Sequence, residues 1–150
     1  MNILVVDDEI SYRQMLATFL KLENWTVFTA GDGVEALKQL EEVKIDFIIS
    51  DIYMPNMDGL KLHARVRELT DYKRTPYLFV SGYGDQFTLG ALPMTRNDGF
   101  IQKTKPLTLL KRWIQYLMIP EDKRPSTPPI EKPLPTQYER TRDMSAHRRR

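Results

Sequence analysis

Two kinds of segment alternate along the first 119 residues of this chain, and this alternation restricts the fold more than any other feature. Short apolar runs typical of strands lie at residues 3–6, 25–29, 46–50, 76–80 and 99–102. Stretches with helical periodicity lie at about 10–22, 33–42, 58–69 and 107–118, and a weaker candidate lies at about 85–95. Such alternation predicts a parallel sheet with helices on both faces.

Five strand–helix units fit a flavodoxin-like α/β fold, a doubly wound (βα)5 domain with a parallel five-stranded sheet of order 2-1-3-4-5. In this order the chain changes direction between the first and third strands, and ligands of open α/β sheets bind outside the carboxyl ends of strands at such a point. The residues that follow these two strands are therefore the first candidates for a site.

The helical stretches differ in how clearly they are marked. The stretch over 33–42 has apolar residues at spacing three, at Val34, Leu37, Leu40 and Val43. The fourth helix is interrupted by helix-breaking residues, namely Gly82, Gly84, Gly90 and Pro93. An interior Gly costs about 1 kcal/mol relative to Ala and an interior Pro about 3 kcal/mol. We therefore expect the fourth helix to be short, shifted or mobile.

The composition changes at Pro120. Residues 120–150 hold six of the ten prolines, with eight Lys or Arg and five Asp or Glu, whereas residues 1–119 hold 14 basic and 15 acidic residues. We expect one folded domain over 1–119 and a disordered, Pro-rich basic tail over 120–150. Because the folded part is not basic, it is not expected to bind nucleic acid.

The cellular compartment is indicated by what the sequence lacks. The chain has no Cys, which excludes disulfides and thiolate metal sites. Its apolar runs are far shorter than the roughly 18 residues of a membrane helix, and its start has no basic leader of the kind found in signal peptides. We expect a cytoplasmic protein with no membrane partner.

Three carboxylates follow the first and third strands, those of Asp7, Asp8 and Asp51. Three carboxylates in one crevice repel each other unless a cation is present, and oxygen ligands of this kind suit Mg²⁺. A carboxylate can also act as a nucleophile and form an aspartyl-phosphate. Ser81 and Lys103 follow the fourth and fifth strands, where a hydroxyl and an ammonium would supply the positioning and charge neutralisation that phosphoryl transfer needs.

At this point the chain resembles a known family, the response-regulator receiver domain of two-component signalling, over about residues 1–119. The resemblance is carried by Leu4-Val5-Val6-Asp7-Asp8-Glu9, Asp51-Ile52-Tyr53-Met54-Pro55-Asn56-Met57-Asp58-Gly59, Val80-Ser81-Gly82 and Gly99-Phe100-Ile101-Gln102-Lys103. Each motif is weak alone, but the ordered set at successive strand ends is specific, and the segment that begins at Asp51 is its most specific piece.

The resemblance implies a metal and phosphoryl site. Asp51 would accept the phosphoryl group from the phosphohistidine of a sensor histidine kinase or phosphotransfer protein. Asp8 would ligate Mg²⁺ directly and Asp7 mainly through water, and Asp51 with the backbone carbonyl of Tyr53 would complete the protein's share of the shell. Bulky side chains two residues past Asp51 and Ser81, at Tyr53 and Tyr83, would slow hydrolysis of the phosphoryl group.

The resemblance also implies a switch. Ser81 would hydrogen-bond a phosphoryl oxygen, Lys103 would pair with the phosphoryl group, and Phe100 matches the aromatic residue that rotates inward when Ser81 moves. Family members usually have Pro directly after this Lys, whereas here Lys105 precedes Pro106. The spacing from Phe100 and Ser81 favours Lys103 over Lys105.

The sequence therefore predicts a Mg²⁺-dependent phosphoacceptor switch without external turnover, which a partner reads at the face of the fourth helix, fifth strand and fifth helix. A phosphorylation-dependent homodimer stays open. The alternatives are a phosphorylation-independent scaffold, a DNA-associated regulator that acts through the basic tail, and a Mg²⁺-dependent phosphohydrolase. Phosphohydrolases of this kind usually have Asp-x-Asp at the end of the first strand, and the run Asp7-Asp8-Glu9 disfavours that alternative.

Asp58 is predicted to cap the third helix. His63 and His147 are predicted to be surface residues.

Overall fold

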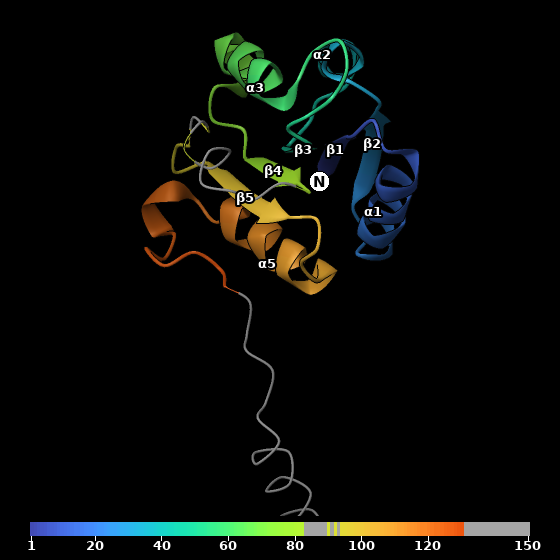
Figure 1. Cartoon of the computed structure of the whole chain (residues 1–150). Helices are drawn as coiled ribbons and strands as arrows, with labels where there is room; N and C mark the ends of the chain where they lie inside the picture. The colour runs from blue at the N-terminus through green and yellow to red at the C-terminus, as the bar shows by residue number, and fades with distance from the viewer. Residues whose placement is uncertain (83–89, 91, 93, 131–150) are drawn as a thin grey trace, which may run out of the picture.

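The structure is a computed structural model of the chain, and it describes residues 1–82, 90, 92 and 94–130. Five parallel strands have the order β2-β1-β3-β4-β5, which confirms the predicted flavodoxin-like topology (Figure 1). The strands are β1 (Asn2–Val6), β2 (Thr26–Ala30), β3 (Phe47–Ser50), β4 (Tyr77–Ser81) and β5 (Asp98–Gln102). Each strand begins and ends within one residue of its predicted range.

Helices cover both faces of this sheet, with α1 and α5 on one face and α2 and α3 on the other (Figure 1). They are α1 (Ile10–Leu22), α2 (Gly33–Glu42), α3 (Gly59–Glu68) and α5 (Leu107–Met118), and two 3₁₀ turns are η1 (Thr70–Tyr72) and η2 (Glu121–Lys123). The helix expected at about 85–95 falls mostly on residues outside those described. In the part of the chain that is described, no helix has the length and apolarity to span a membrane.

The core consists of two layers separated by the sheet. Successive side chains of β1 point to opposite faces, so Leu4 and Val6 pack with α2 and α3, whereas Ile3 and Val5 pack with α1 and α5. All four side chains are 0–1% exposed. Burial on both faces explains why the central strands are apolar throughout instead of alternating.

Two Asp side chains fix where α2 and α3 begin. Asp32 accepts a hydrogen bond from the Glu35 N–H at 2.8 Å. Asp58 accepts one from the Lys61 N–H at 2.8 Å, so its predicted role as a cap is confirmed. The apolar face predicted for α2 is wrong at Val34, which is 44% exposed. Leu40 of the predicted stripe is buried, together with Gly33 and Ala36.

The residues after α5 pack against the domain as far as Ile130. The Arg124 side chain donates hydrogen bonds to backbone carbonyls, those of Arg96, Leu117 and Ile119. The Tyr116 hydroxyl donates to the Pro125 carbonyl at 2.7 Å, and Arg112 donates to the Ile130 carbonyl at 2.6 Å. The packed unit therefore extends past residue 119, and the expectation of a disordered tail remains a prediction for 131–150, which lie outside the described residues.

Candidate functional site

The sheet brings the predicted acidic residues together at one edge. Backbone pairing continues past the strand ends, because the Asp51 N–H donates to the Val6 carbonyl at 2.9 Å and the Asp7 N–H donates to the Ala30 carbonyl at 3.1 Å. Carboxylate oxygens of Asp7, Asp8 and Asp51 lie within 4.8 Å of one another. Asp7 and Asp51 are buried and Asp8 is exposed, so the cluster opens to solvent on the Asp8 side.

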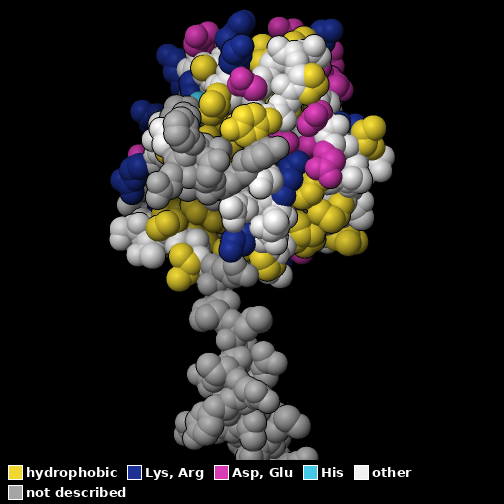
Figure 2. Space-filling view, viewed as in Figure 1, with side chains coloured by type: hydrophobic (Ala, Val, Ile, Leu, Met, Phe, Trp, Pro, Cys, Tyr) yellow, Lys and Arg dark blue, Asp and Glu magenta, His cyan; other side chains and the backbone are white. Residues whose placement is uncertain are grey.

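Lys103 carries the ammonium that enters this cluster. The Lys103 N–H donates to the Ser81 carbonyl at 2.9 Å, which fixes the residue beside the end of β4. Its Nζ lies 2.8 Å from Asp7 Oδ2, 3.1 Å from Asp51 Oδ2 and 3.2 Å from Glu9 Oε2. Lys105, the alternative, is exposed. In Figure 2 acidic side chains border a basic one over this edge of the sheet.

The charges in the cluster do not balance. Burial, together with repulsion from Asp51, raises the pKa of Asp7 above its usual value even though Lys103 and the Glu9 N–H bond to it. Burial alone would lower the pKa of Lys103, but its bonds to Asp7 and Asp51 outweigh this effect and the pKa is raised. A single ammonium is therefore shared among several carboxylates. The excess negative charge and the all-oxygen donor set fit a divalent cation such as Mg²⁺.

The Asp51 carboxylate is held by both of its oxygens. Oδ1 accepts a hydrogen bond from the Ile52 N–H at 2.7 Å, and Oδ2 lies 3.1 Å from Lys103 Nζ. The Asp51 backbone carbonyl accepts a hydrogen bond from the Ser50 hydroxyl at 2.7 Å. Asp51 is 8% exposed, so its carboxylate is fixed in position and still reachable from solvent.

The loop from β3 to α3 returns close to Asp51. The Gly59 N–H donates to the Ile52 carbonyl at 2.7 Å, and the Tyr77 hydroxyl donates to the Gly59 carbonyl at 3.2 Å. Asn56, which has a φ of 67°, donates from its side chain to Asp32 at 2.8 Å. A Cβ on Gly59 would lie 2.0 Å from the Asp51 carbonyl oxygen. Glycine is thus required where α3 begins.

Gly59→Ala is expected to lower the free energy of unfolding by about 1–3 kcal/mol, because the added methyl group displaces backbone and not a flexible side chain. Gly82→Ala is the matched control, since a Cβ at Gly82 would meet no atom of the described residues within 4 Å. Urea denaturation followed by circular dichroism measures both. Equal unfolding midpoints for the two variants would contradict the steric account.

The other predicted site residues lie at or near this edge. Ser81 is 0% exposed at the end of β4, and Tyr53 is 53% exposed in the loop after β3. Phe100 on β5 is partly buried and packs against the core layer of α2 and α3. Tyr83, predicted to limit access of water to the phosphoryl group, lies outside the described residues.

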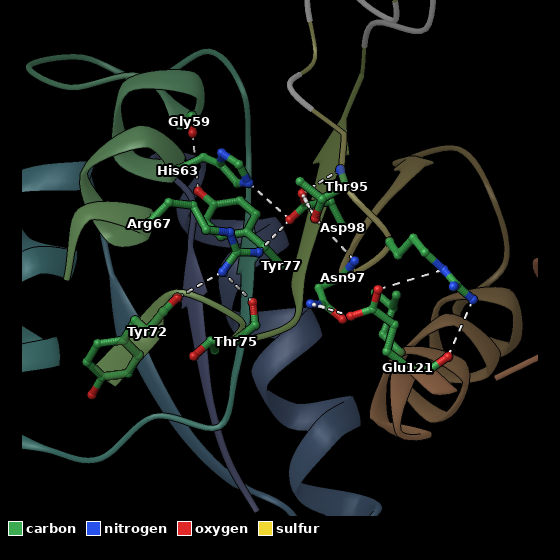
Figure 3. A network of polar contacts seen from close by, with 12 residues as sticks. Gly59, His63, Arg67, Tyr72, Thr75, Tyr77, Thr95, Asn97, Asp98 and Glu121 are labelled. Atoms are coloured by element: carbon green, nitrogen blue, oxygen red, sulfur yellow. Dashed lines mark hydrogen bonds and ion pairs between the residues drawn. The ribbon is translucent and has the colours of Figure 1, made fainter. Parts of the chain in front are cut away.

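The prediction that His63 is a surface residue is wrong, because the residue is 3% exposed. His63 Nε2 lies 3.0 Å from Asp98 Oδ1, and Arg67 Nη2 lies 2.7 Å from the same oxygen (Figure 3). The His63 ring also packs edge-on against Tyr77, with ring centroids 4.8 Å apart. Its partner at the start of β5 is distant in sequence, so a helix pattern alone could not reveal the pair.

Sequence reasoning assigned no role to three residues that border the site. Glu9 contacts the Lys103 ammonium, Arg13 donates to the Asp7 backbone carbonyl at 2.6 Å, and the Tyr12 ring lies beside Lys103. All three belong to the connection and first turn that follow the end of β1. Their position directly after a strand end that carries site residues was the available signal.

Comparison with known proteins decides the family. The family model described as "Response regulator receiver domain" matches residues 3–115. This chain belongs to that family. An uncharacterized 14.6 kDa protein of Leptolyngbya boryana is 36% identical over 81% of this chain and 95% of its own length. The sensor kinase CckA of Brucella abortus is 32% identical over 81% of this chain. The matched region is only 13% of the length of that kinase.

Solved receiver structures have the same fold. The chemotaxis protein CheY4 of Vibrio cholerae has a TM-score of 0.71 and 33% identity, covering 78% of this chain and 98% of that one. The response regulator TrrA of Thermotoga maritima, solved in complex with Mg²⁺ and BeF, has a TM-score of 0.66 and 28% identity, covering 78% and 98%. Receiver domains act as signalling switches in two-component systems, so this family membership gives the domain its general role.

Proposed function

We propose that this receiver domain is a cytoplasmic phosphoacceptor switch whose acceptor is Asp51. The supporting observation is that the Asp51 carboxylate lies 3.1 Å from the Lys103 ammonium and within 4.8 Å of the Asp7 and Asp8 carboxylates. The phosphoryl donor is the phosphohistidine of a sensor histidine kinase or phosphotransfer protein. Membership of the receiver family supports this class of donor.

Phosphoryl transfer at this site requires one nucleophile. An Asp51 carboxylate oxygen forms the new O–P bond, the N–P bond of the phosphohistidine breaks, and its electron pair stays on the imidazole nitrogen. The Lys103 ammonium pairs with the charge that collects on the phosphoryl oxygens. The Ile52 N–H holds Asp51, and the neighbouring carboxylates hold Lys103 next to it, so both groups already lie at the site before transfer.

The acidic edge of the sheet would hold Mg²⁺ through Asp8, Asp51 and the Tyr53 backbone carbonyl, with Asp7 acting mainly through water. When bound, the ion would neutralise charge on the phosphoryl oxygens and orient them for attack. The arrangement of oxygen donors in the structure supports this assignment. The TrrA complex with Mg²⁺ and BeF supports it by similarity.

Phosphorylation would be read out through Ser81 and Phe100. The Ser81 hydroxyl would hydrogen-bond a phosphoryl oxygen, and Phe100 would turn inward as Ser81 moves. The surface of β5, α5 and the predicted fourth helix would then change conformation, and a downstream protein partner would recognise this change.

The test is labelling of the full chain with acetyl phosphate. We expect incorporation of phosphate that needs Mg²⁺ and is lost in Asp51→Asn. Asp58→Asn is the matched control, because Asp58 caps α3 and Asn caps helices as well as Asp does. Absence of labelling in the wild type would contradict the proposal and favour a phosphorylation-independent scaffold.

A further inference from the structure

The ring of Tyr12 lies beside the Lys103 ammonium. Lys103 Nζ lies 4.6 Å from the ring centroid, within the range of a cation–π contact. Tyr12 is half-buried in the first turn of α1 and packs against the core layer of α1 and α5. The ring is therefore fixed by packing and not by the charges of the site.

The four groups around the ammonium differ in how they respond to changes in charge. Asp7, Glu9 and Asp51 attract Lys103 through negative charge, and this attraction weakens whenever that charge is neutralised or screened. The Tyr12 ring is neutral, and burial raises the pKa of its phenol to about 12. Its attraction for Lys103 thus persists when the carboxylates are neutralised.

We propose that Tyr12 is a positioning residue. Its ring face keeps the Lys103 ammonium beside Asp51 when a bound cation neutralises the carboxylates. This inference rests on the proposed function, because it gives Lys103 its role toward the phosphoryl group. The aromatic ring has this positioning role, and the hydroxyl has none. Tyr12→Phe should therefore behave like the wild type, whereas Tyr12→Leu should not.

The experiment compares the rate of labelling by acetyl phosphate at saturating Mg²⁺ for wild type, Tyr12→Phe and Tyr12→Leu in the full chain. We expect Tyr12→Leu to be about 5-fold slower, the effect of losing one half-buried cation–π contact. Phe19→Leu is the matched control, since Phe19 is another half-buried aromatic residue of α1 in the same core layer. Its labelling rate should stay within 2-fold of the wild type, on the order expected for a change away from the site.

A double-mutant cycle separates positioning from general packing. In a Lys103→Met background, Tyr12→Leu should slow labelling no further, because the contact is already lost. Calorimetric titration with Mg²⁺ gives a readout besides labelling, and Tyr12→Leu should bind the ion more tightly, since a less restrained ammonium competes less for the carboxylates.

Equal rates for Tyr12→Leu and wild type, or a Tyr12→Phe variant as slow as Tyr12→Leu, would overturn the inference. An undiminished effect in the Lys103→Met background would do the same. Failure of the proposed function looks different, because the wild type itself would then take up no label at Asp51.

Discussion

Asp98→Ala is expected to lower the free energy of unfolding by about 3–5 kcal/mol, the usual cost of leaving a buried charge without its partner. The Asp98 side chain is 0% exposed and receives hydrogen bonds from Arg67 at 2.7 Å and from the Thr95 hydroxyl at 2.7 Å. His63 lies against the same carboxylate (Figure 3). Removing the Asp98 carboxylate would leave the partly buried Arg67 guanidinium, 17% exposed, without a counter-charge.

Urea denaturation at neutral pH measures this effect. Glu68→Ala is the matched control, because Glu68 pairs with Arg65 on the same helix at 3.8 Å but both side chains are more than half exposed. We expect the control to lose about 0.5 kcal/mol or less. Asp98→Asn is the milder variant, to be used if the alanine variant does not fold. Losses as small as that of Glu68→Ala in both Asp98 variants would contradict the account.

The effect of Asp98 should depend on pH. Burial alone would raise its pKa, but the hydrogen bonds from His63 and Thr95 outweigh this and hold the pKa below the usual 3.8. A depressed carboxylate pKa contributes stability above the unfolded-state pKa, and that contribution is lost as the pH falls through the folded-state pKa. The difference in unfolding free energy between wild type and Asp98→Asn should therefore shrink below about pH 4.

Lys103→Met is expected to slow labelling of Asp51 by about 100-fold, the scale seen when one preorganised charge stabiliser is removed. Lys103 Nζ contacts both Asp7 and Asp51, and its side chain is only 14% exposed, so solvent screens it weakly. Affinity for Mg²⁺ should not fall, because the variant removes a cation that competes for the carboxylates.

Lys105→Met is the matched control for this prediction. Lys105 is exposed and directly precedes Pro106, the position at which the family usually has its site lysine. Its labelling rate should stay within about 2-fold of the wild type, because exposed charges are screened by water. A large loss in Lys105→Met with normal labelling in Lys103→Met would show that the wrong lysine has been assigned.

The order of elements and the acidic cluster were predictable because both follow from local patterns. Runs such as Ile3–Val6 are apolar throughout, since helices cover both faces of the sheet, and this property is visible without a structure. The strand order then places the residues after β1 and β3 side by side, which is why Asp7 and Asp51 could be brought together by topology alone.

The features that were missed depend on partners far apart in the chain. His63 was expected at the surface because no partner is visible near it in the sequence. Its partner, Asp98, lies 35 residues away. Arg124 was assigned to a disordered tail because most of its acceptors are backbone carbonyls, which a composition does not reveal. Val34 fits an apolar stripe at spacing three, yet the face of α2 that is buried in the structure consists of Gly33, Ala36 and Leu40.

The most direct test of the central claim is a crystal structure of the full chain grown with Mg²⁺ and beryllofluoride. The account predicts the beryllofluoride group attached to an Asp51 carboxylate oxygen, with the Lys103 ammonium on one fluorine and Mg²⁺ against Asp8. A structure in which Asp51 carries no such group, and Lys103 still bridges Asp7 and Asp51, would contradict it.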